Sequence, residues 1–181
     1  MAEPARRQAP RFTESERVRL APPASRWVLR GAAPALAAAG AAFGPVPSTL
    51  AGRAVVLGAR AALWLGPDEQ LLLAPASEAD ALAAALAGAL APLPHSLVDV
   101  SHRQVGLTVS GRHATLLLNA GCPLDLAVSE FPSGTCTRTV FAKAEVVLWR
   151  TDVERFHLEV WRSFAGYVSE LLAEIGRELR A

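Results

Sequence analysis

Five side chains near the middle of the sequence are of types that can do chemistry: the thiols of Cys122 and Cys136, and Asp99, His102 and Asp125. A nucleophilic cysteine needs a base and an orienting group beside it, and His102 with Asp99 could supply both to Cys122. No local signature supports that arrangement, however. Cys122 also follows a predicted helix end, where the helix dipole disfavours a thiolate. We therefore predict structural thiols and no catalytic residue in this chain, with a Cys122-dependent enzyme as the weaker hypothesis.

Metal, phosphate and nucleic-acid sites are all disfavoured by the residue pattern. A zinc site needs four protein ligands, or three and a water, but the histidines are scattered and the sequence contains no CxxC or HxxxH. Neither GxGxxG nor GxxxxGK[ST] occurs, so no dinucleotide fold or P-loop is indicated. The formal net charge of +1 provides no excess of positive charge of the kind that binds nucleic acid. We predict no metal-binding and no cofactor-binding residue.

The apolar segments are too short and too interrupted for a membrane helix. No run approaches the roughly 18 uninterrupted apolar residues that such a helix needs. The Ala-rich stretch over residues 31–47 is broken by prolines and glycines, and the first twenty residues contain no apolar signal segment. Two cysteines are compatible with a reducing compartment. We expect a cytoplasmic protein with no membrane partner.

The chain of 181 residues divides at "APLPH", where two prolines mark a boundary. We predict a polar tail over residues 1–20, a first lobe over 21–94 and a second lobe over 95–181. Strands could be exchanged between the lobes, which would together form one compact subunit.

The first lobe should contain a strand over residues 25–31, a short helix from Pro34 and a hairpin about Gly66–Glu69. A helix capped by Ser77 should follow, with Leu82, Leu86 and Leu90 on one face.

The second lobe repeats this order. We predict strands within residues 97–111, a helix closed by Gly121, and one strand over 136–150 that turns near Thr151 and Asp152 into another over 155–161. A last helix over 163–179 carries a buried apolar stripe, made up of Phe164, Tyr167, Val168, Leu171, Leu172, Ile175 and Leu179. The fold class is therefore α+β, with two small lobes of antiparallel strands and helices packed on one face.

Five phrases occur in order along the chain: "ALWLGPDEQLLLAP", "LVDVSHRQVGL", "AGCPLDL", "FPSGTCTRTVFAKAEVVLWR" and "FHLEVWRSFAGYVSELL". Together they resemble the gamma subunit family of bacterial heterotetrameric sarcosine oxidase. The resemblance covers about Ser25 to Leu179, and it is loose over the N-terminal tail and over residues 31–53.

The resemblance implies membership of a cytoplasmic flavoenzyme built from alpha, beta, gamma and delta subunits. Such an enzyme oxidatively demethylates sarcosine to glycine, producing hydrogen peroxide and either formaldehyde or, with tetrahydrofolate, methylenetetrahydrofolate. FAD, FMN, NAD and tetrahydrofolate would be bound by other subunits. The implied fold is similar to part of the folate-binding aminomethyltransferase fold of the glycine cleavage T-protein.

That kinship supplies an alternative, a stand-alone folate-binding or one-carbon transfer protein. Against it, the T-protein fold needs a longer chain to complete its folate cavity, and "NAGCPLDL" departs from the Lys-Gly-Cys-Tyr-x-Gly-Gln-Glu type of motif in the related iron–sulfur maintenance proteins. For the subunit hypothesis, charged residues set within the apolar phrases are the predicted subunit-interface residues: Arg103, Asp125, Arg138, Lys143 and Arg162.

Overall fold

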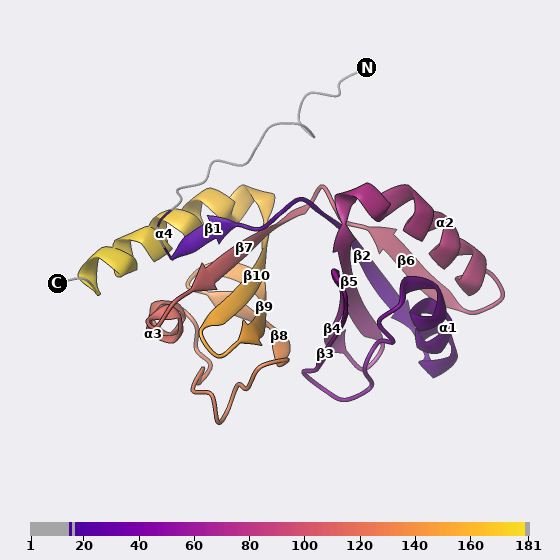
Figure 1. Cartoon of the computed structure of the whole chain (residues 1–181), viewed down its shortest axis with the longest axis horizontal. Coiled ribbons are helices and arrows are strands. Elements are labelled where there is room, and N and C mark those ends of the chain that lie inside the picture. Colours follow the sequence, from indigo (N-terminus) through magenta and orange to yellow (C-terminus); the bar gives the residue numbers. More distant parts are fainter. Residues whose placement is uncertain (1–14, 16, 180–181) are drawn as a thin grey trace, which may run out of the picture. The chain divides into compact units, whose positions relative to one another are not determined.

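Residues 15 and 17–179 are described by the computed structural model (Figure 1). Most of the predicted polar tail, residues 1–20, lies outside this range. Its last residues are not a tail, because Val18–Leu20 forms strand β1. Val18 is buried and pairs with Val109 in an antiparallel register, so this short apolar segment extends a sheet.

The chain folds into two compact units. The N-terminal unit comprises residues 22–101 and 133–138, and the C-terminal unit comprises the described residues before position 22 together with residues 102–132 and 139–179. The boundary that we predict between residues 94 and 95 lies a few residues before this division. The reason is that strand β6, which follows residue 94, pairs with β2 of the N-terminal unit.

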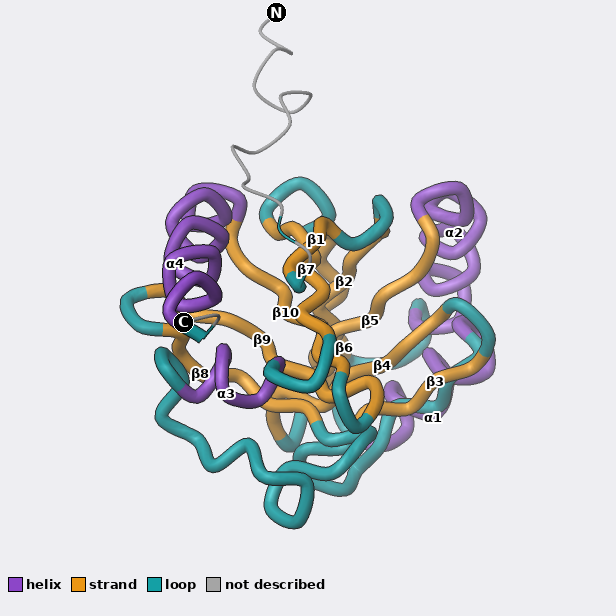
Figure 2. Tube along the Cα trace, turned by 60° about the vertical axis from the view of Figure 1, so that its left-hand side comes forward, coloured by secondary structure: helices purple, strands orange, loops and turns teal. Residues whose placement is uncertain are grey.

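The N-terminal unit is a five-stranded antiparallel sheet with two helices on one face (Figures 1 and 2). Its strand order is β3-β4-β5-β2-β6. The predicted first strand, the hairpin and both helices are present. The elements are β2 (Ala24–Gly31), α1 (Ala33–Phe43), β3 (Ala54–Leu57), β4 (Arg60–Gly66), β5 (Glu69–Pro75), η1 (Ala76–Glu78), α2 (Ala79–Leu90) and β6 (His95–Asp99).

The core of this unit lies between the sheet and the helices. The leucines that we predict on one face, Leu82, Leu86 and Leu90, are all buried there. The predicted cap at Ser77 is wrong. Residues 76–78 first form the 3-10 helix η1, and α2 begins at Ala79 with Glu78 at the N-cap and no side-chain capping bond.

The C-terminal unit is also an antiparallel sheet whose helices lie on one face (Figure 2). Its strand order is β1-β7-β10-β9-β8, which confirms the predicted α+β class. Its further elements are β7 (Gln104–Ser110), α3 (Ala114–Asn119), β8 (Cys136–Phe141), β9 (Ala144–Asp152), β10 (Arg155–Trp161), η2 (Arg162–Phe164) and α4 (Ala165–Glu178).

The strand that we predict over residues 136–150 is in fact two strands, β8 and β9. They are joined at Ala142 and Lys143, and Ala142 adopts a positive φ of 51°. The pattern concealed this turn because it has none of the Gly, Pro, Asn or Asp residues that usually mark one. The next turn lies at Val153 and Glu154, two residues beyond the predicted position.

The stripe on α4 is buried only in part. Val168 and Leu172 are fully inside the core, with Leu171 and Ile175 packed against it. By contrast, Phe164 and Tyr167, which we predict to be buried, are exposed. None of the helices within residues 17–179 combines the length and the apolar character needed to cross a membrane.

Candidate functional site

Two of the predicted interface residues, Arg103 and Arg162, come together where β10 runs into α4. The Arg103 guanidinium lies 5.4 Å from the centre of the Trp161 ring, within the range of a cation–π contact. The backbone N–H of Arg162 donates a hydrogen bond of 2.9 Å to the carbonyl oxygen of Arg103. Arg103 and Trp161 are both exposed, so this junction presents an aromatic ring and a cation at the surface.

Arg138, a third predicted interface residue, has a partner within its own unit. Its guanidinium donates to Glu69 at 2.6 Å, and Arg30 donates to the other oxygen of the same carboxylate at 3.0 Å. Burial raises the pKa of the Glu69 carboxyl, but the two arginines lower it by more, so it lies below its usual value. The role of Glu69 could not be predicted from the sequence, because no local pattern pairs it with Arg30, 39 positions away, or with Arg138, 69 positions away.

Asp125 and Lys143 lie in separate turns. The Asp125 carboxylate accepts a hydrogen bond of 2.8 Å from the N–H of Ala127, which fixes the local turn. Lys143 is exposed at the turn between β8 and β9. An interface role for these two residues therefore remains a prediction.

The two thiols are buried and free. Cys122 has Thr139 as its polar neighbour, at 3.9 Å between sulfur and hydroxyl oxygen. Cys136 donates to the carbonyl oxygen of Trp64 at 3.6 Å, and burial raises its pKa to about 11. The carboxylate of Asp99 accepts from the backbone N–H of Ser101, and not from a histidine.

Arg150 holds the segment between α3 and β8 in place. Its side chain is fully buried and lies 4.3 Å from the centre of the Phe156 ring. The guanidinium donates to the carbonyl oxygens of Leu126 and Val153. The segment over residues 119–136 is therefore anchored by a buried cation, which supports the structural interpretation of its cysteines.

A second buried polar pair lies on β10. The Nε2 atom of His157 is 2.8 Å from Oε1 of Glu159, whose side chain is fully buried. The opposite strand makes room with Gly106, where an added Cβ would lie 2.7 Å from the His157 ring. Alternation along a strand places residues i and i+2 on one face, so the sequence contained a signal for this pair.

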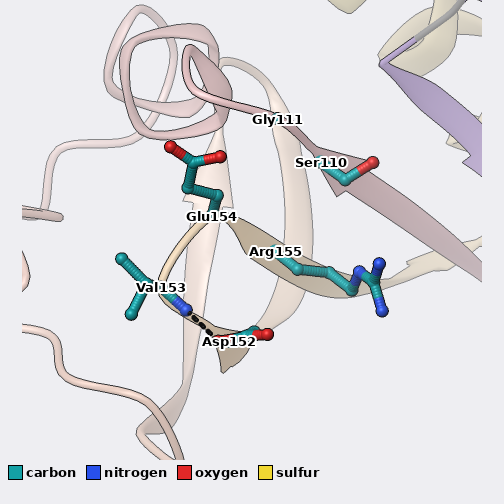
Figure 3. A pocket seen from close by; sticks show the side chains of 6 residues that line it. All are labelled: Ser110, Gly111, Asp152, Val153, Glu154 and Arg155. Carbon is teal, nitrogen blue, oxygen red and sulfur yellow. Dashed lines mark hydrogen bonds between the residues drawn. The ribbon is translucent and has the colours of Figure 1, made fainter.

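An open pocket of about 410 Å³ lies at the turn between β9 and β10. Figure 3 shows the charged ends of Glu154 and Arg155 pointing to different sides of this turn. The Asp152 carboxylate forms a hydrogen bond within the turn, accepting from the backbone N–H of Val153 at 2.7 Å. The described part of the chain also contains no cluster of three or more His, Cys, Asp or Glu suited to a metal ion. The lining residues are Ser110, Gly111, Asp152, Val153, Glu154 and Arg155.

Comparison with known proteins connects this architecture to one family. A family model described as "Sarcosine oxidase, gamma subunit family" matches residues 30–178. Sarcosine oxidase subunit gamma from Corynebacterium sp. (strain U-96) is 36% identical over 141 residues. That match covers 78% of this chain and 64% of the relative, so the chain spans less than two thirds of the relative's length.

Solved structures show the same relationship. A chain of the heterotetrameric sarcosine oxidase from Corynebacterium sp. U-96, in complex with pyrrole 2-carboxylate, superposes with a TM-score of 0.85 at 31% identity, covering 94% of this chain and 89% of that one. The glycine cleavage system aminomethyltransferase T from Bartonella henselae shares the fold, with a TM-score of 0.65 at 15% identity over 86% of this chain and 44% of that one. The chain belongs to the sarcosine oxidase gamma subunit family.

Proposed function

We propose that this chain is the non-catalytic gamma subunit of a heterotetrameric sarcosine oxidase. The observation that carries the proposal is the superposition of 94% of the chain on a chain of such an enzyme, with a TM-score of 0.85. The complex oxidatively demethylates sarcosine to glycine. Its other products are hydrogen peroxide and either formaldehyde or, with tetrahydrofolate, methylenetetrahydrofolate.

The partners in this proposal are the alpha, beta and delta subunits, in the cytoplasm. FAD, FMN, NAD and tetrahydrofolate are bound by those subunits and not by this one. The hydrogen bonds of the buried charged groups support the assignment of the cofactors to the other subunits, because these groups are bonded within the C-terminal unit. Arg150 donates to two backbone carbonyls and Glu159 pairs with His157, so these groups stabilise the C-terminal unit itself.

Co-expression with the genes of the other three subunits tests the proposal. We expect the chain to co-purify with a yellow complex that oxidises sarcosine, and to be colourless and inactive when purified alone. An affinity-tagged chain that brings down no flavoprotein would overturn the proposal. Sarcosine oxidation by the chain alone, or sulfhydryl-dependent turnover lost in Cys122→Ala, would overturn the non-catalytic role.

The shared fold with aminomethyltransferase T favours a second candidate, a stand-alone folate-binding or one-carbon transfer protein. Titration of the purified chain with tetrahydrofolate, followed by calorimetry, separates the two. Stoichiometric binding to the lone chain would favour the second candidate. A lone chain that binds no tetrahydrofolate, together with incorporation into the complex, would favour the subunit.

A further inference from the structure

The exposed aromatic side chains of the described residues all lie within one stretch of seven residues. Trp161 is 41% exposed, Phe164 39% and Tyr167 38%. They occupy the end of β10, the short helix η2 and the first turn of α4, where the orange strand passes into the yellow helix in Figure 1. The other described tryptophans, at positions 27, 64 and 149, are buried or half-buried.

The three exposed rings are not the residues that pack α4 against the sheet. Phe164 and Tyr167 are three residues apart at the start of the helical segment, a spacing that places two side chains on one side of a helix, and Trp161 ends the strand that leads into it. The core is filled instead by Ala165 and Val168, which are fully buried. Three large rings therefore remain partly exposed and outside the core cluster of the C-terminal unit. Tryptophan and tyrosine are enriched among binding hot spots.

The charged side chain that lies directly over one of these rings is positive. Arg103 lies over Trp161, and Arg162 follows it directly in η2. Helix α4 has no acidic residue in its first turn, so the partial positive charge of its N-terminus is not compensated there. The first acidic residue of the helix is Glu170, in the second turn.

We propose that Arg103, Trp161, Phe164 and Tyr167, here called the aromatic patch, bind an acidic segment of a non-identical subunit in the complex. The inference rests on the proposed function and names the surface that it uses. The positive charge selects an acidic partner through electrostatic complementarity. A second copy of this chain fits less well. A two-fold contact would bring the same patch of both copies together and place the two Arg103 side chains close to each other.

A competition experiment tests the patch in the assembled enzyme. Wild-type and variant chains carrying different tags are co-expressed at equal levels with limiting amounts of the other three subunits. The double variant R103E/Y167A reverses the charge at one exposed position and removes the ring at another. We expect its share of the purified complex to fall from one half to about 3%, the result of a roughly 30-fold weaker association, as truncation of hot-spot residues produces.

The matched control is R112E/L116A, which changes an exposed arginine and an exposed leucine (55% exposed) elsewhere on the C-terminal unit. We expect it to retain an equal share. Circular dichroism and melting temperature of each purified chain establish that the variants are folded, and R103K should recover much of the incorporation lost in R103E.

Three outcomes overturn the inference, and they differ from failure of the proposed function. An equal share for folded R103E/Y167A, or equal losses in R112E/L116A, means that the aromatic patch is not the docking surface, whereas incorporation of the wild type still supports the subunit role. Loss of self-association by the lone chain, without loss of incorporation, identifies a second copy as the occupant. A wild-type chain that never enters the complex instead removes the proposed function.

Discussion

Arg150 is the largest fully buried side chain described in this protein. Burying a cation is costly unless its donors are satisfied, and burial lowers the pKa of this guanidinium. Arg150 meets the requirement in part. Its two Nη atoms donate to the backbone carbonyls of Val153 and Leu126 and its face lies against Phe156, whereas its Nε is buried without a hydrogen-bond partner among the described residues. One side chain thereby connects the loop after α3 with the turn between β9 and β10.

We predict that R150M destabilises the chain by about 1–3 kcal/mol, because the buried carbonyl group of Leu126 loses its donor and an unsatisfied buried group costs that much. Urea denaturation followed by tryptophan fluorescence measures the change. The control R155M alters an exposed arginine on β10 and should change stability by less than about 0.5 kcal/mol. Equal stabilities for R150M and R155M would contradict the anchoring role.

The Cys136 thiol offers a chemical test of burial. With its pKa raised to about 11, it is almost entirely protonated at pH 8, and the thiolate is the reactive form. In a C122A background, we expect a disulfide reagent to label the chain at pH 8 only after unfolding in urea. Rapid labelling of the native chain would show that the site opens readily.

The same thiol predicts a dependence of stability on alkaline pH. In the unfolded chain the thiol ionises near its usual value of 9.0, whereas in the folded chain it stays protonated up to about 11. The unfolded state therefore loses its proton first, and the stability contributed by Cys136 decreases as pH rises from about 9 to about 11. We expect C136A to show a smaller decrease over this interval than the wild type, measured as the free energy of unfolding.

At the scale of elements, residues 133–138 lie between two segments of the C-terminal unit in the sequence but pack within the N-terminal unit. The N–H of Ala54 donates to the carbonyl oxygen of Gly134, and the N–H of Cys136 donates to that of Gly52, both at 2.8 Å. Both glycines have positive φ, 70° at Gly52 and 85° at Gly134, which a glycine adopts without strain. The pair between Arg138 and Glu69 fixes the end of this segment.

The Arg138–Glu69 pair predicts a dependence of stability on acidic pH. Because the pKa of Glu69 lies below its usual value of 4.5, its contribution is present above pH 4.5 and is lost as pH falls below that value. We expect E69Q to remove this part of the dependence of stability on acidic pH. We expect R138M to lower the free energy of unfolding by about 1 kcal/mol at neutral pH, since Arg30 still pairs with the Glu69 carboxylate. Chemical denaturation between pH 3 and 7 measures both effects. If E69Q loses as much stability at acidic pH as the wild type, Glu69 is not the cause of the loss.

At the scale of the whole molecule, each unit is assembled from separated parts of the sequence. Strand β1 joins the C-terminal unit by pairing with β7, and residues 133–138 join the N-terminal unit from the other half of the chain. The chain therefore cannot be cut once into two complete units.

We predict that a fragment of residues 22–101 is less stable than the same residues in the full chain. It lacks the two backbone hydrogen bonds made with residues 134 and 136, and Arg138, one of the two arginine partners of Glu69. Hydrogen exchange should show weaker protection of β3 and β4 in the fragment, and fusing residues 133–138 to its C-terminus by a flexible linker should recover part of it. Equal protection in the fragment and in the full chain would contradict this view.

The fold class and the family could both be predicted from the order of the residues alone. Periodic leucines located α2, the Gly66–Glu69 turn located the β4–β5 hairpin, and an apolar stripe located α4, because each depends on neighbours close in the sequence. The five ordered phrases indicated the family for the same reason, since each is a short continuous stretch of chain. The turn at Ala142 and the start of α2 were predicted wrongly, because local residue types there are compatible with more than one backbone conformation.

The pairing of polar groups, by contrast, depends on the tertiary structure. Arg138 and Glu69 are 69 positions apart and Arg150 and Leu126 are 24 apart, so no local pattern could pair them. Which side chains of the apolar stripe on α4 are buried also depends on the tertiary structure. Helical periodicity assigns Tyr167 and Val168 to the same apolar stripe, but Val168 packs into the core of the C-terminal unit and Tyr167 stays exposed. Periodicity fixes the direction of a side chain, whereas burial depends on what the rest of the chain places opposite it.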